Sequence, residues 1–278
     1  MTFSWPLRFA LGVLVLFVLI ALVGPFLIEH DPLRGSLRTR LVPPAWVEGG
    51  SFDHVLGTDR LGRDILARIV AGARISLTVC IVVIAIAGSV GTAIGTLSGY
   101  AGGWVDRLLM RLVDLALSLP VILLALLFAA VSGPSFTNIV VVISLVLWSQ
   151  YARMARGETM RVRNEDYVDL ARTSGLSHLR IIWRHVLPNI APSLIVVATL
   201  QVGVVIVLEA SLSFLGVGVP PPNPTWGGMV AEGRSYIVSA WWASALPGIA
   251  IVIVVMAVNV LGDAMTDRIN PGLRGRNG

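Results

Sequence analysis

The stretch NEDYVDLARTSGLSHLRIIWRHVLPN, which runs from Asn164 to Asn189, is the longest polar interruption in the second half of a very apolar chain. Its first part places four residues at positions i, i+3, i+4 and i+7, which is the spacing of one helix face. These residues are Tyr167, Leu170, Ala171 and Ser174. The spacing predicts a short, half-apolar helix, and a helix of this length is marginal unless it packs against something.

A turn and a second helix are expected after it. Gly175 stands where helices commonly end in the left-handed conformation, and Ser177 is a residue type that caps helices. The apolar residues from Leu179 to Val186 recur on one side of the second helix. Pro188 lacks an amide hydrogen and is expected to break or kink the chain. The hairpin would either pack on the protein's own helices or dock in a groove of a partner.

The surrounding chain is typical of a membrane protein. It has 278 residues, of which 55% are hydrophobic and 13% charged, about half the charged share of a soluble domain. Several apolar segments reach the ~20 residues that a helix needs to cross a bilayer core. The sequence therefore predicts an all-α integral membrane protein. Six transmembrane helices are expected, over residues 9–28, 77–97, 112–131, 138–151, 193–215 and 242–261.

The first of these segments is interpreted as an uncleaved helix and not as a signal peptide, because it is long and no A-x-A cleavage site follows it. The fourth is short and is expected to continue past Tyr151 as a polar helix. The predicted organisation has four parts. They are residues 1–28 (N-terminal end and first helix), 29–74 (extracytoplasmic loop), 75–262 (a five-helix transmembrane domain with a cytoplasmic loop over 152–192) and 263–278 (cytoplasmic tail).

The charges favour a membrane orientation and not a nucleic-acid partner. All 21 basic residues are arginine, and they lie between apolar segments instead of forming a basic domain. With the N-terminus inside, most of them fall on cytoplasmic segments, which agrees with the positive-inside rule. Both termini and the stretch from Asn164 to Asn189 are therefore expected to be cytoplasmic.

The loop over residues 29–74 changes character along its length. Proline and glycine make its first half irregular, whereas apolar residues recur at helical spacing from Asp59 to Ala71. This pattern predicts a short amphipathic helix, either at the membrane interface or packed on the other helices. His30 and His54 also lie in this loop, but none of the four histidines forms a metal-spaced cluster. The single cysteine, Cys80, excludes a disulfide within the chain.

The stretch from Asn164 to Asn189 also resembles the cytoplasmic EAA loop of ABC-importer permeases, whose pattern is E-A-A, three residues, G, nine residues, I, one residue and L-P. Leu170 and His185 depart from it, because alanine and isoleucine are usual there. The positions that match, with Asp in place of Glu, are Asp169, Ala171, Gly175, Leu187 and Pro188.

Three further segments resemble the dipeptide, oligopeptide and nickel importers within this family. They are LGTDRLGRDILARIVAGARISL (Leu56–Leu77), EASLSFLGVGVPPPNPTWG (Glu209–Gly227) and NVLGDAMTD (Asn259–Asp267). The GTD segment is similar to the second of the two permease subunits. The resemblance implies the type I ABC importer permease fold, with a cytoplasmic coupling helix.

The same resemblance implies a function and a set of partners. The chain would form half of the translocation pathway of an ATP-driven importer for di- or oligopeptides, although relatives also handle glutathione and chelated nickel. The implied partners are a second, homologous permease in a heterodimer, two ABC ATPase subunits, an extracytoplasmic binding protein and membrane lipid. ATP and Mg²⁺ would be bound by the ATPase subunits, because a chain without lysine cannot contain a G-x-x-x-x-G-K-[ST] loop. We expect no enzymatic activity and no cofactor in this chain.

Two groups of residues are candidate sites. The ATPase-coupling group is Asp166, Tyr167, Asp169, Leu170, Ala171, Ser174, Gly175, Leu187 and Pro188. The pathway group is Gln201, Glu209, Ser211 and Ser213. Glu209 is an acid within an apolar run, so it would face the pathway, form an interhelical hydrogen bond or contact the binding protein.

An ion-coupled secondary transporter is the alternative class. Such proteins often show internal repeats and broken helices at mid-membrane, and the sequence shows no convincing repeat.

A second acid, Asp114, lies near a membrane edge and is expected to pair with Arg111 at i−3.

Overall fold

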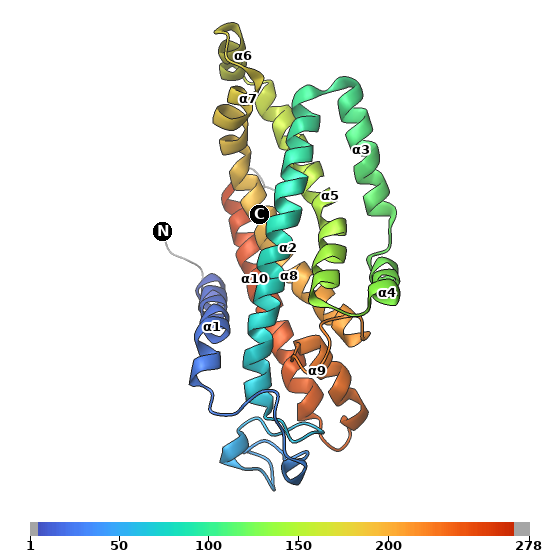
Figure 1. Ribbon diagram of the computed structural model, residues 1–278. Helices are drawn as coiled ribbons and strands as arrows, with labels where there is room; N and C mark the ends of the chain where they lie inside the picture. The colour runs from blue at the N-terminus through green and yellow to red at the C-terminus, as the bar shows by residue number, and fades with distance from the viewer. Residues whose placement is uncertain (1–4, 270–278) are drawn as a thin grey trace. The chain divides into compact units, whose positions relative to one another are not determined.

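The computed structural model describes residues 5–269, which form helices and loops with no strand (Figure 1). An isolated bridge joins Thr58 and Asp64. The predicted tail over residues 263–278 lies partly outside the described range. The helices are α1 (Trp5–Leu27), η1 (Leu37–Thr39), η2 (Phe52–His54), α2 (Ile65–Ala101), α3 (Gly103–Ser118), α4 (Val121–Ser132), α5 (Phe136–Arg163), α6 (Asp166–Thr173), α7 (His178–Ile181), η3 (Ile182–Val186), α8 (Leu187–Phe214), α9 (Trp226–Gly233), η4 (Arg234–Tyr236) and α10 (Trp242–Ile269).

The described residues contain five helices that are long and apolar enough to cross a membrane. These are α1, α2, α5, the continuous helix formed by α7, η3 and α8, and α10. A sixth span is present if the bent pair α3 and α4 is counted as one. The predicted all-helical membrane fold is confirmed, and α5 continues past Tyr151 to Arg163 as expected.

The third predicted span is not one straight helix. α3 and α4 meet at an angle of 79°, and Leu119 between them has an extended backbone (φ −84°, ψ 122°). Leu119 precedes Pro120, and a residue before proline is disfavoured in the helical conformation. The apolar run over residues 112–131 therefore hides a break that a single proline causes.

The predicted amphipathic helix over residues 59–71 is not a separate element. Residues 58–64 are loop, and α2 begins at Ile65 and continues for 37 residues to Ala101. Arg63, Asp64 and Arg68, expected on a polar outer face, are instead buried. They can be buried because Arg63 and Arg68 have an ionic partner inside the protein and Asp64 lies within hydrogen-bond distance of His54.

Pro188 does not break the chain. It lies in the first turn of α8, directly after the π-helical turn η3. The amide of Leu187 donates to the carbonyl of Ile182, five residues earlier. This wider register rearranges the hydrogen bonds just before the proline, so its missing amide hydrogen is accommodated within a continuous helix.

The chain divides into two compact units, each described by itself. The first unit comprises Met1–Ile81, Ala125–Val140 and Val202–Val260, and the second comprises Val82–Leu124, Val141–Gln201 and Leu261–Gly278. In the first unit, the Trp226 indole of α9 is buried and donates to the Ile69 carbonyl of α2 at 2.8 Å. Its ring lies 5.6 Å from the Phe17 ring of α1, between centroids.

In the second unit, α2 crosses α5 at a row of glycines. A Cβ atom on Gly91 would lie 2.2 Å from the Trp148 carbonyl oxygen, and one on Gly95 would lie 2.2 Å from the Ala152 carbonyl oxygen. No side chain fits at such distances, so the two backbones approach closely only because these residues are glycine. The crossing fixes α5, which leads into the polar stretch from Asn164 to Asn189.

Candidate functional site

α6 and the continuous helix formed by α7 and η3, with the turn between them, form a helical hairpin that we call the coupling hairpin, after the role predicted for it. Gly175 ends α6 with φ +80°, as predicted. Its amide donates to the Arg172 carbonyl at 3.0 Å, and the Leu176 amide donates to the Ala171 carbonyl at 3.2 Å. This pair of bonds is the Schellman motif, which satisfies the open carbonyls at a helix end. Ser177 occupies the N-cap position of α7 without a side-chain capping bond.

The inner side of the coupling hairpin is packed on the second unit. Val168 and Ala171 of α6 belong to a buried apolar cluster, with Leu176 and Leu187 packed against it. The other buried members come from α5, α7, η3 and α8, and they are Ala155, Val162, Ile181, Val186 and Ile190. Ala171, which the sequence groups with the outer residues, is 7% exposed and faces this cluster. The alanine of the motif is therefore a packing residue.

The outer side of α6 carries both apolar and acidic groups. Leu170 is 67% exposed, and Tyr167 beside it on the helix is also exposed. Asp169 forms an ion pair with Arg172 at 3.1 Å, both at the surface. Of the nine predicted coupling residues, Leu187 is half-buried against the cluster and Pro188 is exposed at the start of α8. The outer residues are Asp166, Tyr167, Asp169, Leu170, Ser174 and Gly175.

The second helix of the coupling hairpin does not present one apolar side, as its spacing suggests. Ile181 and Val186 are buried, whereas Leu179 and Trp183 are each 71% exposed. Leu179, Ile182 and Trp183 instead line an open apolar cavity of about 600 Å³, together with residues of α2. Periodicity could not separate these two sides, because apolar residues occupy both.

The coupling hairpin is also held by polar contacts that the sequence does not reveal. The Tyr100 hydroxyl near the end of α2 shares a hydrogen bond with His178 Nδ1 at 3.0 Å. The Arg172 guanidinium lies 5.4 Å from the centre of the Tyr100 ring, a cation–π distance. Arg163 donates to the Tyr100 carbonyl at 2.9 Å. Tyr100 therefore connects α2, α5 and both hairpin helices.

Glu209 is placed inside the first unit. It is 1% exposed, and its carboxylate accepts from the Ser213 hydroxyl at 2.8 Å and from the Ser76 hydroxyl at 3.3 Å. Ser76 lies on α2, so one of these bonds joins two helices. This geometry favours the interhelical hydrogen bond among the three roles predicted for Glu209.

The other predicted pathway residues have different partners. Gln201 is buried and donates from Nε2 to Gln150 of α5, within the second unit. The Ser211 hydroxyl donates to the Val207 carbonyl at 2.7 Å. Ser211 and Val207 line an open cavity of about 390 Å³ in the first unit. Ser211 thus borders a cavity and is half-buried, whereas Gln201, Glu209 and Ser213 are buried.

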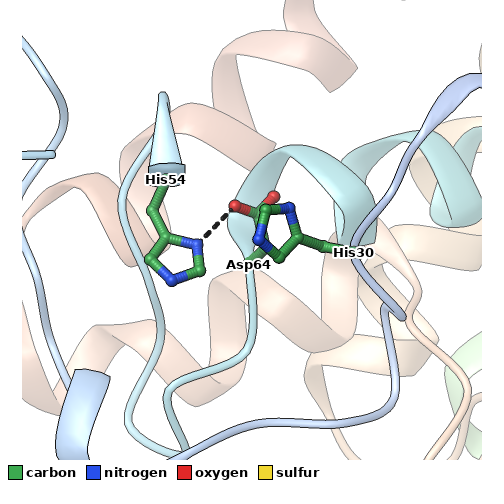
Figure 2. A group of neighbouring side chains, drawn as sticks. All are labelled: His30, His54 and Asp64. Atoms are coloured by element: carbon green, nitrogen blue, oxygen red, sulfur yellow. Dashed lines mark hydrogen bonds and ion pairs between the residues drawn. The ribbon is translucent and has the colours of Figure 1, made fainter. Parts of the chain in front are cut away.

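Three side chains of the first unit lie together although the sequence does not group them: His30, His54 and Asp64 (Figure 2). His30 follows α1, His54 ends η2, and Asp64 precedes α2. Their potential ligand atoms all lie within 4.8 Å of one another. Sequence spacing could not indicate this group, because a long loop brings it together.

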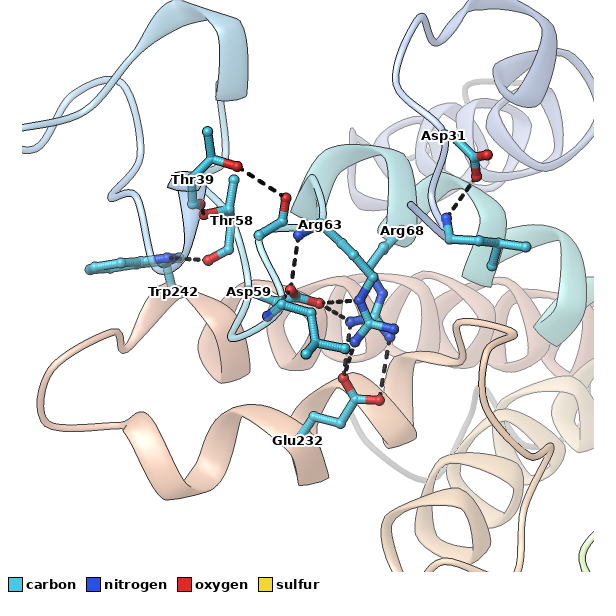
Figure 3. A network of polar contacts seen from close by, with 11 residues as sticks. Asp31, Thr39, Thr58, Asp59, Arg63, Arg68, Glu232 and Trp242 are labelled. Atoms are coloured by element: carbon cyan, nitrogen blue, oxygen red, sulfur yellow. Dashed lines mark hydrogen bonds and ion pairs between the residues drawn. The ribbon is translucent and has the colours of Figure 1, made fainter. Parts of the chain in front are cut away.

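A buried ionic network lies next to this loop (Figure 3). Arg63 donates to Asp59 at 2.7 Å and to Glu232 of α9 at 2.6 Å, and Arg68 of α2 contacts the same two carboxylates. Burial raises the pKa of Asp59, but the Arg63 amide and the two guanidinium charges outweigh it, so the pKa is lowered overall.

The acid Asp114 pairs with Arg153 at 2.7 Å, which corrects the expected pairing with Arg111.

The chain is similar in sequence to known transport proteins. Residues 91–275 match the family model described as "Binding-protein-dependent transport system inner membrane component". The chain is 41% identical over 268 residues to the di/tripeptide transport system permease protein DppC of Pseudomonas aeruginosa, covering 95% of this chain and 88% of that protein. It is 43% identical over 262 residues to the dipeptide transport system permease protein DppC of Escherichia coli K12, covering 94% and 87%.

Solved structures show the same fold. A structure of the MetNI methionine ABC transporter in an inward-facing conformation aligns with a TM-score of 0.60, at 17% identity, covering 73% of this chain and 96% of that chain. A second crystal form aligns with a TM-score of 0.56. Similarity at this identity concerns the fold.

Proposed function

Because the chain belongs to the family of binding-protein-dependent transport system inner membrane components, we propose that it forms half of the translocation pathway of an ATP-driven importer for di- and oligopeptides. The family and the MetNI likeness confirm the expected type I ABC importer permease fold. The relatives named above are di- and tripeptide or dipeptide permeases, and they support a peptide as the substrate. They do not favour an ion-coupled secondary transporter.

The proposal includes the other components of such a system. A second, non-identical permease completes the pathway, and an extracytoplasmic binding protein delivers the peptide. Two ABC ATPase subunits bind ATP and Mg²⁺ and drive the cycle. Both termini and the coupling hairpin lie in the cytoplasm of a bacterial cell with an inner membrane, in agreement with the arginine distribution.

One observation carries the coupling role: α6 exposes Tyr167 and Leu170 while its opposite side is fixed in the buried cluster. Exposed apolar and aromatic side chains on one side of a helix whose other side is packed suit a helix that docks in a partner's groove. Because Val168 and Ala171 pack on α5 and α8, a displacement of α6 is transmitted to those helices. Closure of the ATPase pair would thereby shift the permease between its two states.

The four polar residues of α8 predicted to line the pathway fall into two groups. We assign Ser211 to the pathway wall, since it borders a cavity. Glu209 and Ser213 are assigned to the contact between α2 and α8, and Gln201 to the contact between α8 and α5, because each is buried with a hydrogen-bond partner. Peptide selection would then depend mainly on the binding protein.

The test uses the reconstituted complex in proteoliposomes. Peptide uptake should need ATP and the binding protein and should persist when ion gradients are collapsed. Leu170→Glu, on the outer side of α6, should leave the permease folded but reduce its association with the ATPase and therefore uptake. Leu37→Glu, at a leucine that is 75% exposed in the loop after α1, is the matched control. Uptake that follows the ion gradient without ATP would refute the importer role, and normal uptake by Leu170→Glu would refute the docking surface.

A further inference from the structure

The group formed by His30, His54 and Asp64 has the composition of a metal site. Two imidazole nitrogens and one carboxylate oxygen are the donors that Zn²⁺ takes most readily in sites with three protein ligands and water. Each of the three residues offers one such atom, and all these atoms lie within 4.8 Å of one another. Ligands about 2 Å from a common ion are themselves separated by roughly 3 to 4 Å, so small side-chain rotations suffice.

Asp64 is already held in a ligand-like position. One carboxylate oxygen accepts from the Ala67 amide at 2.8 Å, which caps the start of α2. The other oxygen lies 2.9 Å from His54 Nδ1. The residue is buried, so its carboxylate has little freedom to turn toward water. A carboxylate fixed by a backbone amide, with its second oxygen directed at an imidazole, is preorganised for coordination.

The two histidines approach this carboxylate from different segments. Ser51 holds the start of η2 by accepting from the His54 amide at 3.2 Å, through its carbonyl, and from the Asp53 amide through its hydroxyl. The His30 ring, which follows α1, lies 4.9 Å from the His54 ring between centroids. Figure 2 shows both rings beside the Asp64 carboxylate. The three donors therefore come from the end of α1, the loop and the start of α2.

The surroundings leave room for an ion and for water. His30, His54 and Asp64 line an open cavity of about 370 Å³, whose wall also contains Glu29 and Asp31. Arg34 lines the same cavity, but it is largely exposed and pairs with Asp31 at 3.3 Å. The cavity thus supplies an entry path and further oxygen donors, as a site with an open coordination position needs.

From this geometry we propose that His30, His54 and Asp64 form a transition-metal site, with Zn²⁺ as the fitting ion, in the loop between α1 and α2. A bound ion would clamp α1 and η2 to the start of α2. This site is independent of the coupling hairpin and of the transport proposal. Ca²⁺ and Mg²⁺ do not fit, because they take oxygen ligands in preference to imidazole.

The test measures metal binding by the assembled transporter complex, purified in nanodiscs with an affinity tag that lacks histidine and stripped with EDTA. Zn²⁺ is titrated against a fluorescent chelator, and Co²⁺ is used as a spectroscopic probe of the site. The wild-type complex should bind one Zn²⁺ equivalent. The variants His30→Gln, His54→Gln and Asp64→Asn should lose this equivalent or bind it roughly 10- to 100-fold more weakly, because even changes to residues that only orient a metal ligand weaken binding by this factor. His178→Gln, in the coupling hairpin, is the control and should keep the equivalent.

Several results would overturn the proposal. One such result is that the three variants bind the same number of Zn²⁺ equivalents as the wild type, with the same affinity. Another is that excess Mg²⁺ displaces the bound Zn²⁺. His30 is exposed, so His30→Gln should fold even if the buried Asp64→Asn does not. Unchanged Zn²⁺ binding by His30→Gln alone would therefore refute the three-ligand site, whatever happens to the other variants.

Discussion

Neighbouring residues of α6 lie on opposite sides of the helix, one exposed and one buried. Leu170 is exposed on the outer side, and Ala171 is buried against the cluster below. The spacing of Tyr167, Leu170, Ala171 and Ser174 predicts one face, and the EAA-like pattern does not separate its members either. The difference depends on which helices pack under α6, and that is a tertiary property. The sequence therefore predicts the helix and its turn, but not which of its residues remain available to a partner.

Gly175 is expected to be necessary for its conformation and not for space. A Cβ atom there would meet nothing within 4 Å, but its φ of +80° is strained for any other residue. Gly175→Ala should cost about 1–2 kcal/mol in the turn and reduce the peptide imported per ATP hydrolysed. Gly157→Ala is the matched control, because that helical glycine also has open space and should be neutral or slightly stabilising. Equal coupling ratios in the two variants would show that the turn does not matter.

Glu209 should act through hydrogen bonds and not through its charge. Glu209→Gln can still bond to Ser76 and Ser213, so we expect peptide uptake near the wild-type rate. Glu209→Ala leaves these hydroxyls without their partner and creates a cavity, and it should lower the thermal stability of the purified permease. A large loss of uptake in Glu209→Gln, with normal stability, would instead assign the charge to the pathway.

At the scale of elements, hydropathy locates the spans but misses their interruptions and joins. The apolar run over residues 112–131 contains the turn at Leu119, and α2 includes the last part, from Ile65 on, of the loop predicted over residues 29–74. Both outcomes depend on features that an average over a window hides. One proline breaks the first segment, and the buried partners of Arg63 and Arg68 let the polar start of α2 pack inside the protein.

The crossing of α2 and α5 makes a sharp prediction. Gly95→Ala places a methyl group 2.2 Å from the Ala152 carbonyl oxygen, so the helices must separate. We expect a loss of about 1–3 kcal/mol, typical of overpacking, measured by denaturant unfolding of the purified permease. Gly12→Ala in α1 is the control, since nothing lies within 4 Å of its added atom. Equal stability of the two variants would contradict the close approach.

The ionic network around Asp59 should make the loop before α2 sensitive to acid. The pKa of Asp59 is lowered in the folded protein, so the carboxylate stabilises the fold above its unfolded pKa, and this stability is lost as the pH falls through the folded value. Asp59→Asn should cost about 3–5 kcal/mol at neutral pH, because it leaves Arg63 and Arg68 under-paired. The difference from the wild type should shrink below about pH 4.

The matched control for that experiment is Asp53→Asn, since Asp53 is an exposed acid of the same loop. It should change stability little at any pH. A pH-independent difference between the wild type and Asp59→Asn would mean that packing, and not charge, explains the loss.

For the whole molecule, the proposed orientation can be tested by chemical labelling. The single cysteine, Cys80, is buried, so Cys80→Ser gives a background without reactive thiols. In that background, Asp53→Cys should react with a membrane-impermeant maleimide in intact spheroplasts. Thr173→Cys, at the exposed end of α6, should react only after the membrane is permeabilised. The opposite pattern would invert the topology.

The two-sided build of α6 has an evolutionary consequence. Substitutions on its inner side must stay compatible with this chain alone, whereas those on its outer side would have to stay compatible with the proposed ATPase subunit, another gene product. The two sets of positions can therefore drift independently. Exchanging the outer residues other than Gly175, namely Asp166, Tyr167, Asp169, Leu170 and Ser174, for those of a related transporter should redirect the permease to that transporter's ATPase without disturbing its own assembly.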